Sequence, residues 1–363
     1  MAVCNLLQIQ TAHCRRCQGK RVFCMKNGVR MLDIAEKLGV SVVTVSNALA
    51  GRDGVSEQVR QQICQVAEEM GYKPSNIGNK KKSDISKIGK SVAILTPEKF
   101  VGCMGTFYWE LTANISNKLS AVSILMVYEC ISGENEKNLV LPSAITESKV
   151  DGVIVIGQLS REYALELSKI ELPLLFVDFY VSRCEVDSVN SDSFHGGYTV
   201  TDYLVEKGHK NIGFIGTLNS TSSINDRYLG YRKCLMENGL EFNKKWLLDD
   251  RDENGIFLDH IDFPDDMPTA FFCNCDETAF RVISALKSKG VSVPEDISIV
   301  GYDNYTVSNI CIPTITTVEV DLIKMAAEAV RIMIKKLENP LYAVGRRIIS
   351  GRLIEKNSVL DIG

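Results

Sequence analysis

The sequence predicts two parts: a small all-α head that contains a helix-turn-helix, and a larger α/β core of two lobes with parallel sheets. The head is indicated by residues 29–72, where apolar residues recur at helical spacing on both sides of a turn glycine. The core is indicated from residue 91 onward, where short apolar runs alternate with helical stretches. A chain of 363 residues is long enough to give such domains separate hydrophobic cores.

The composition is that of an ordinary globular protein, with 45% hydrophobic and 24% charged residues. No apolar run approaches the roughly 20 residues that a membrane-spanning helix needs. The 12 cysteines follow no regular spacing and no signal peptide precedes them, so we expect reduced thiols. These observations favour a cytoplasmic protein with no membrane partner.

The net charge of −4 conceals an uneven distribution. Residues 25–90 carry 11 Lys and Arg against 7 Asp and Glu, and residues 1–24 carry basic side chains but no acidic ones. The rest of the chain, residues 91–363, is acidic, with a net charge of −12. A basic front on an acidic body indicates that only the front meets a polyanion.

Residues 1–24 show neither a strand nor a helix pattern. The Cys14-x-x-Cys17 spacing would suit zinc, but a second pair of ligands at a finger or ribbon spacing is missing, so we expect no metal site. The segment is then either a disordered basic tail or not part of the native product. In the second case Met25 or Met31 would be the natural start.

The head begins with two predicted helices joined by a tight turn. In the first, residues 31–38, apolar side chains three and four positions apart share one face. Gly39 ends this helix, because glycine tolerates the positive φ that the turn requires. Ser41 is placed to N-cap the second helix, residues 42–49, and a third helix begins after Ser56.

The outer face of the second predicted helix starts with Val42 and Val43. An exposed pair of valines is unfavourable in water, but their methyl groups can meet thymine methyls in a major groove, where Asn47 offers its amide to a base edge. The alternative is that the pair has no function. We predict that the following residues contact double-stranded DNA: Ser41, Val42, Val43, Thr44, Ser46 and Asn47.

Short apolar runs that are typical of buried strands recur through the core. They cover residues 92–95, 123–127, 152–156, 174–177, 212–215, 270–273 and 297–301. Helical patterns lie between them, and strands that alternate with helices form parallel sheets covered on both faces. These strands exceed what one compact sheet domain usually holds, so we expect two lobes.

Candidate ligand-binding residues follow these strands, because ligands bind outside the carboxyl ends of parallel strands. They are Phe107, Tyr108, Asp178, Phe179, Tyr180, Arg227, Asp276 and Asp303. Aromatic rings with carboxylates and one arginine suit a small polyhydroxylated or heterocyclic ligand. Alternatively, Phe107 or Phe179 belongs to the core and Asp276 only caps a helix. Packing explains Arg227 and Asp303 less easily.

No common catalytic motif is present: the sequence lacks a P-loop, a G-x-S-x-G elbow, an H-E-x-x-H and a dinucleotide-binding glycine pattern. Only 4 histidines are available as general bases, and His209 lies in a predicted surface turn. We therefore expect a protein that is not an enzyme and that uses no cofactor.

Motifs that follow one another along the head make a more specific case. The chain reads D-I-A-x-x-L-G-V-S-x-x-T-V-S-x-A-L from Asp33, G-x-x-G-V-S-x-x-V-R-x-x-I from Gly51, and G-Y-K-P from Gly71. In this combination it resembles the LacI/GalR family of bacterial transcription regulators, the lactose-repressor type. The resemblance continues to the C-terminus and implies a core similar to periplasmic sugar-binding proteins. It also implies that the chain crosses between the lobes near residues 187–193, 316–321 and 345.

Residues 74–90 correspond to the hinge of that family, in which a helix folds on DNA and places a leucine in the minor groove. Here Lys81 stands at the position that aligns with this leucine, so the apolar wedge is missing. The composition of the segment also makes a poor helix. We predict that Lys80, Lys81 and Lys82 contact phosphates or a narrow minor groove; a plain solvated linker is the alternative.

The resemblance implies a repressor of a carbohydrate or nucleobase operon, controlled by a small effector, a sugar or a nucleobase, in the cleft between the lobes. The family pattern supports Arg227 and Asp303 as effector contacts, whereas Cys275 replaces an asparagine of many sugar-responsive members. The alternative is a regulator of the catabolite-control type, which answers to a partner protein. Thr278–Lys289 is a candidate surface for that partner.

One recognition helix reads only about half a turn of groove, so affinity requires two half-sites at a fixed spacing. We therefore expect a homodimer, or a tetramer, on a pseudo-palindromic operator. Closure of the cleft on its effector would reorient the lobes and change the spacing of the two heads. The expected domains are residues 25–73 for the head, 74–90 for the hinge, and 91–363 for the effector-binding and dimerisation core.

Overall fold

The structure, a computed structural model, describes residues 31–49, 55–70, 72, 89–101 and 107–363. The chain divides into two compact units, Met1–Ser83, which holds the head, and Asp84–Gly363, which holds the core. The expectations for residues 1–24 and for Lys80, Lys81 and Lys82 lie outside the described residues.

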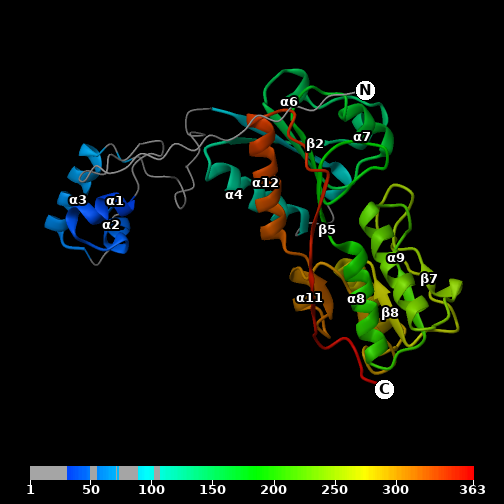
Figure 1. Cartoon of the computed structure of the whole chain (residues 1–363). Coiled ribbons are helices and arrows are strands. Elements are labelled where there is room, and N and C mark those ends of the chain that lie inside the picture. Colours follow the sequence, from blue (N-terminus) through cyan, green and yellow to red (C-terminus); the bar gives the residue numbers. More distant parts are fainter. Residues whose placement is uncertain (1–30, 50–54, 71, 73–88, 102–106) are drawn as a thin grey trace, which may run out of the picture. The chain divides into compact units, whose positions relative to one another are not determined.

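The described part of the head contains the helices α1 (Met31–Leu38), α2 (Val42–Leu49) and α3 (Glu57–Glu69) (Figure 1). The first two begin and end at the predicted residues. Between them Gly39 has a φ of +63°, which confirms the expected turn, because residues with a side chain are strained there. One fully buried side chain from each helix meets the others in the core of the head: Ile34, Val45 and Ile63.

Hydrogen bonds at the helix ends fix the position of α2. The Thr44 N–H donates to Ser41 Oγ over 3.0 Å, so Ser41 caps the helix as predicted. Ser56 stands at the N-cap position of α3, but its side chain makes no capping hydrogen bond. At the other end of α2, the Arg60 guanidinium donates to the Ala48 carbonyl oxygen over 3.1 Å and ties α2 to α3.

The first lobe of the core is built on a six-stranded parallel sheet with the order β11-β5-β4-β3-β1-β2. Its strands are β1 (Ser91–Pro97), β2 (Leu125–Ile131), β3 (Gly152–Ile156), β4 (Leu174–Val177), β5 (Ser188–Ser191) and β11 (Arg346–Ile349). Alternate residues face opposite layers. In β1, Val92 and Ile94 point to one buried cluster, and Ala93 and Leu95 point to another.

Helices cover both faces of this sheet. The helices α4 (Phe107–Ser120) and α12 (Leu322–Glu338) lie side by side on one face (Figure 1). The other face is covered by α6 (Ser143–Thr146) and α7 (Arg161–Leu167). The short helices η2 (Glu98–Phe100) and α5 (Gly133–Lys137) follow β1 and β2. The central strands β1, β3 and β4 are buried on both sides, which explains why they read as nearly continuous apolar runs.

The second lobe contains a four-stranded parallel sheet with the order β7-β6-β8-β9. Its strands are β6 (Ile212–Ile215), β7 (Leu247–Leu248), β8 (Ala270–Cys273) and β9 (Ser298–Val300). Its helices are α8 (Ser193–Glu206), α9 (Ser222–Glu237), η3 (Lys244–Trp246), α10 (Asp276–Ser288) and α11 (Thr306–Ile310). The predicted parallel sheets and the division into two lobes are thus confirmed.

Three crossings join the lobes. The first lies between β5 and α8, and the second lies between β10 (Thr317–Glu319) and α12, both where the resemblance implied them. The third was expected near Gly345; because β11 still pairs with β5, the chain crosses a few residues later, after Ile349. It then enters β12 (Arg352–Ile354), which pairs antiparallel with β10. Across the described stretches, every helix is too short or too polar to pass through a bilayer.

Candidate functional site

The outward face of α2 carries the side chains predicted to contact DNA. Val43 is 68% exposed and Val42 is 40% exposed, while the inward residues of the helix are buried. The other predicted contacts are exposed or half-buried: Ser41, Thr44, Ser46 and Asn47. The helix therefore presents two apolar side chains to solvent beside an amide and hydroxyl groups, which is the chemistry that a major groove can accept.

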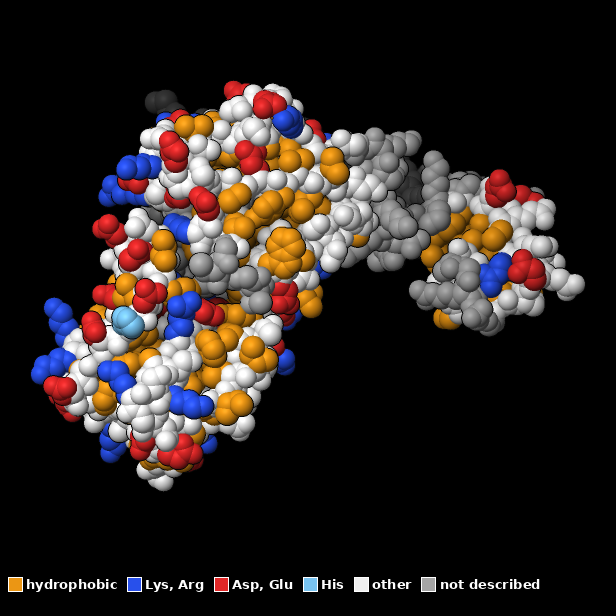
Figure 2. Space-filling view, turned by 180° about the vertical axis from the view of Figure 1, so that it is seen from behind, with side chains coloured by type: hydrophobic (Ala, Val, Ile, Leu, Met, Phe, Trp, Pro, Cys, Tyr) orange, Lys and Arg blue, Asp and Glu red, His pale blue; other side chains and the backbone are white. Residues whose placement is uncertain are grey.

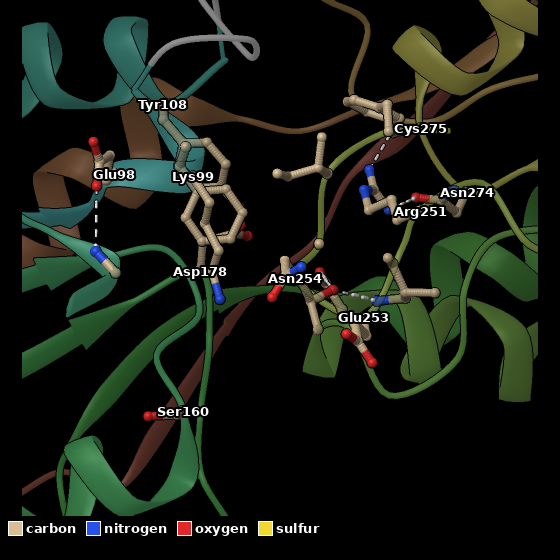
Figure 3. Close-up of a pocket in the computed structure, with 18 of the residues that line it drawn as sticks. Glu98, Lys99, Tyr108, Ser160, Asp178, Arg251, Glu253, Asn254, Asn274 and Cys275 are labelled. Carbon is tan, nitrogen blue, oxygen red and sulfur yellow. Dashed lines mark hydrogen bonds between the residues drawn. The ribbon is translucent and has the colours of Figure 1, made fainter. Parts of the chain in front are cut away.

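A cavity of about 920 Å³ lies between the two lobes of the core (Figure 3). The first lobe, lobe 1, contributes η2, the start of α4 and the loop after β4. The second lobe, lobe 2, contributes α9 and the loops after β7, β8 and β9. Most of these segments follow the carboxyl ends of parallel strands, where open α/β sheets bind ligands. The volume lies in the range of about 300–1,000 Å³ that is usual for small-molecule sites.

Most of the residues predicted from strand ends meet in this cavity. Phe107, Tyr108, Asp178, Arg227 and Asp303 all line it. The first three belong to lobe 1 and the last two to lobe 2. Tyr180 lies instead in an adjoining pocket of about 510 Å³, where its hydroxyl donates to Asp226 over 2.9 Å.

Two predicted residues are placed elsewhere, which corrects their assignment. Phe179 is fully buried in the core of lobe 1, where its ring stacks on Phe176 at 4.4 Å. Asp276 is also fully buried and accepts a hydrogen bond from Thr317 over 2.6 Å. It occupies space left by Gly301, where a Cβ would stand only 2.2 Å from the aspartate oxygen.

Arg227 is the central cation of the cavity. It is 4% exposed, and its Nη2 donates to Asp303 over 3.1 Å while its Nη1 donates to the Asn274 carbonyl oxygen over 2.7 Å. The guanidinium also stacks over the Tyr302 ring at 3.8 Å. Its Nε–H is buried without a partner among the described residues. An unsatisfied buried donor is costly, on the order of 1–3 kcal/mol.

Close packing of two helices sets the position of Arg227. A Cβ on Gly197 of α8 would lie 2.4 Å from the Arg227 carbonyl oxygen, and one on Gly230 of α9 would lie 2.0 Å from that of Phe194. Only glycine permits such an approach of α8 and α9. The D-R-Y-L-G segment therefore carries both the functional arginine and the glycine that places it.

Asp178 faces Arg227 from lobe 1. Its carboxylate accepts a hydrogen bond from the Tyr108 hydroxyl over 3.0 Å, which links the loop after β4 to the start of α4. Asp178 has a φ of +67° and Asp303 a φ of +108°, conformations that residues with side chains rarely adopt. Such strain, on the order of 1–3 kcal/mol per residue, concentrates at functional sites.

Burial changes the protonation of both carboxyl groups. It raises the pKa of Asp178 to about 6 and that of Asp303 to about 7, while the charge of Arg227 opposes both shifts. The buried hydroxyl of Tyr108 has a pKa well above its usual value, first because of burial and then because of Asp178. Near neutral pH the cavity thus contains carboxyl and hydroxyl groups that hold their protons more tightly than usual. Beside them lies a permanent cation, the Arg227 guanidinium.

A second arginine in the cavity was not predicted from the sequence. Arg251 donates from Nη1 to the Asn274 side-chain oxygen over 3.1 Å, forms an ion pair with Asp250 at 3.2 Å, and stacks on Phe257 at 4.4 Å. It follows β7, so the strand-end rule applies to it as well. That strand is only two residues long and gave no recognisable strand pattern.

Cys275 also lines the cavity, beside Arg251. Nη2 of Arg251 lies 3.5 Å from the Cys275 sulfur (Figure 3). The Thr278 hydroxyl lies 3.2 Å from the same sulfur. Burial raises the pKa of this thiol to about 11, so it is neutral and poorly nucleophilic. In the described part of the chain, no group of three or more His, Cys, Asp or Glu side chains is arranged to hold a metal ion.

A helix-turn-helix head joined to a two-lobed core with a cavity between the lobes defines a DNA-binding transcription regulator. Two family models match the chain: that of the bacterial regulatory proteins of the lacI family over residues 30–75, and that of the periplasmic binding protein-like domain over residues 201–359. The chain belongs to the LacI family of transcription regulators.

Relatives agree with this assignment, and a solved structure agrees with the fold. The chain is 28% identical over 313 residues to the HTH-type transcriptional repressor PurR of Histophilus somni, covering 84% of this chain and 91% of that protein. It is 28% identical over 312 residues to the catabolite control protein A of Priestia megaterium, covering 85% and 92%. The lac repressor dimer bound to operator and the anti-inducer ONPF superposes with a TM-score of 0.63 at 21% identity, covering 92% of this chain and 100% of that one.

Proposed function

We propose that this protein is a repressor that binds a pseudo-palindromic operator as a homodimer in the cytoplasm and answers to a small polar effector in the interlobe cavity. The observation that carries the proposal is the cluster of Tyr108, Asp178, Arg227 and Asp303, which faces the cavity from both lobes. The target would be an operon of carbohydrate or nucleobase metabolism, in keeping with the purine-type name of one relative.

DNA recognition is assigned to α2. In this proposal Val42 and Val43 meet thymine methyls, Asn47 reads a base edge, and Ser41, Thr44 and Ser46 position the helix on phosphates and bases. Lys80, Lys81 and Lys82 add phosphate contacts. The exposure of the two valines supports this role, because both keep a large accessible surface on the described head.

The effector would act by joining the lobes. Tyr108 and Asp178 offer hydrogen bonds from lobe 1, and Arg227 and Asp303 offer them from lobe 2. A ligand that touches both sides favours a particular lobe orientation by its difference in affinity between orientations. Through the dimer this change reaches the two heads, which couples the cavity to the operator.

The dimer would form through lobe 1 and lobe 2 together. The strand β2 is an edge of its parallel sheet and exposes Leu125 at 68%, next to α4 with Trp109 at 68%. An uncovered apolar edge strand is unfavourable in a monomer. Figure 2 shows hydrophobic side chains gathered on one face of both lobes. In lobe 2, Ile310 of α11 is 69% exposed.

Oligomeric state and operator binding test this proposal together. Light scattering of the purified protein should give the mass of a dimer, and a tetramer would revise that part only. The double variant Trp109→Glu, Leu125→Arg should give a monomer. Its operator affinity should fall at least about 100-fold, because a monomer has one head and contacts only one of the two half-sites. A wild-type monomer that binds a single half-site would refute the proposal.

A second candidate is favoured by the similarity to a catabolite control protein. In that case a partner protein would dock on α10, where Phe280 is 37% exposed, and the cavity would play no part. A thermal-shift screen with sugars and nucleobases separates the two. Stabilisation by one of them that is lost in Asp178→Asn supports the effector model; no stabilisation, with operator binding that needs a partner protein, supports docking on α10.

A further inference from the structure

The cavity contains a second cluster of hydrogen-bonding groups beyond the one just assigned. Asn274 separates the two, since its backbone oxygen accepts from Arg227 and its side-chain oxygen accepts from Arg251. Arg251 is held by Asp250 and Phe257. Within the described residues its Nε–H makes no hydrogen bond, and its Nη2 contacts only the Cys275 sulfur. A ligand with a single small ring, bound among Tyr108, Asp178 and Arg227, would leave the Arg251 side of the cavity empty.

A preformed turn builds this second side. In the 250–257 turn, Asp252 Oδ1 accepts the backbone N–H groups of Asn254 and Ile256, each over 2.9 Å, and Asp252 N–H donates to the Ile256 oxygen over 2.8 Å. Gly255 takes a φ of +81° at its tip. The turn is therefore ordered by its own hydrogen bonds before any ligand binds.

The 250–257 turn replaces a crossover helix. The link between the parallel strands β7 and β8 contains no helix, although such links usually do. Ile261, Phe263 and Met267 of the same link pack on the core of lobe 2 and take the place of a helix there. This arrangement leaves the first part of the link free to line the cavity, where Glu253 and Phe257 are found.

The turn also reaches across the cleft to lobe 1. A Cβ on Gly255 would lie 3.8 Å from Lys99 Cδ, and the Lys99 side chain extends toward Asn254 (Figure 3). Lys99 and Glu253 line both the main cavity and the pocket of about 510 Å³, so the two spaces are neighbours there. Glu253 makes no hydrogen bond or ion pair that would occupy its carboxylate within the described residues.

The mixed charge of the lining defines the class of ligand. Cations stand at Arg227, Arg251 and Lys99, and carboxyl groups stand near them at Asp178, Asp303 and Glu253. An anionic ligand would meet the carboxylates, and a cationic one would meet the guanidiniums. A neutral ligand with many hydroxyl groups can donate to the former and accept from the latter.

We propose that the effector is a neutral, polyhydroxylated molecule of two linked units, such as a disaccharide, whose second unit binds beneath the 250–257 turn between Arg251, Glu253 and Lys99. This rests on the proposed function, in which the cavity binds the effector. The first unit occupies the cluster around Asp178 and Arg227. The turn then contacts ligand and lobe 1 together, which makes it the element of lobe 2 that senses the length of the effector.

Calorimetry on the full-length protein tests the proposal with defined sugars. The probes are cellobiose, maltose, lactose, melibiose, sucrose and trehalose, each compared with glucose, galactose and fructose. At least one disaccharide should bind at least 10-fold more tightly than either of its component monosaccharides. A monosaccharide that binds as tightly as every disaccharide containing it would overturn the two-unit proposal.

Variants locate the second unit. Glu253→Gln and Lys99→Met should each weaken the disaccharide about 10-fold, and should weaken its monosaccharide clearly less, because each removes a charge-assisted hydrogen bond to the second unit. Glu241→Gln, an exposed lobe 2 glutamate that does not line the cavity, should change neither. Equal losses for disaccharide and monosaccharide, or no loss, would contradict the assignment.

The outcome also separates this proposal from the one on which it rests. If a monosaccharide or a nucleobase binds and Asp178→Asn abolishes its binding, the effector cavity stands and only the two-unit ligand is wrong. If no sugar or nucleobase binds and operator binding depends on a partner protein, both proposals fail together.

Discussion

The two lobes contribute to the cavity in different ways. Lobe 2 provides guanidinium groups that are already fixed, since Arg227 is paired with Asp303 and Arg251 is paired with Asp250. Lobe 1 provides Asp178, which forms no ion pair within the described residues and accepts a hydrogen bond only from Tyr108. The difference indicates that lobe 2 is a preorganised anchor, whereas lobe 1 gains its interactions when the ligand arrives.

The comparison predicts that substitutions in the lobe 2 anchor mainly lower the free energy of unfolding. Arg227→Met should lower the free energy of unfolding by about 3–5 kcal/mol, because it leaves Asp303 buried beside an apolar side chain. Thermal and urea unfolding of the purified protein measure this loss. Arg232→Met on the same helix is the matched control, since Arg232 stacks on Phe242 but is only half-buried, and its loss should be below about 1 kcal/mol. Equal losses in the two variants would contradict the anchor role.

The glycine contact between α8 and α9 sharpens the same point. Gly230→Ala should destabilise the protein by about 1–3 kcal/mol and shift Arg227, because the new methyl group meets the backbone of α8. In lobe 1, Gly133→Ala should be nearly neutral, since a Cβ there has nothing within 4 Å. Urea midpoints of the two variants provide the comparison, and a neutral Gly230→Ala would show that the helices can separate at little cost.

The fold was predictable from the sequence wherever a buried strand consists of an uninterrupted run of apolar residues. The apolar runs at residues 152–156, 174–177, 212–215 and 270–273 became β3, β4, β6 and β8 with the predicted bounds. The strands β5, β7, β10, β11 and β12 were missed. They are short, and β5 carries the polar sequence S-V-N-S although all its residues are buried. Their strand conformation comes from pairing with neighbours, which a local pattern does not contain.

The site was predictable only in part, for a related reason. The strand-end rule found Asp178, Arg227 and Asp303, because each follows a recognisable strand. It could not tell that Phe179 turns into the core while Asp178 turns to the cavity, since that depends on one backbone angle in the left-handed region. It also could not reveal Arg251, whose strand is only two residues long.

The protonation of Asp303 gives a test in lobe 2 with a defined sign. Because burial raises its pKa in the folded state to about 7, the unfolded chain releases this proton at lower pH than the folded one. Stability is therefore lost as the pH rises from about 4 to 7. Relative to Asp303→Asn, the wild type should lose about 2 kcal/mol of unfolding free energy between pH 5 and pH 8.

Unfolding of both proteins in urea at several pH values measures this difference. Contributions of other groups, such as His209, whose pKa is lowered by burial, are common to both proteins and cancel. Parallel pH profiles would mean that Asp303 keeps its charge throughout and that the ion pair with Arg227 outweighs burial.

The smallest effect on stability is expected in lobe 1, where the hydroxyl of Tyr108 can be removed. Tyr108→Phe should cost only about 0.5–1.5 kcal/mol, the value of one hydrogen bond, and should raise the pKa of Asp178 further, since that hydrogen bond lowers it. The loss in the free energy of effector binding should exceed the loss in the free energy of unfolding, because lobe 1 is organised by the ligand. Tyr128→Phe on the edge strand β2 is the control, and it should alter neither quantity, since Tyr128 is exposed and lies outside the cavity. A Tyr108→Phe variant with normal effector binding but a large loss of stability would reverse the comparison and make lobe 1 the rigid partner.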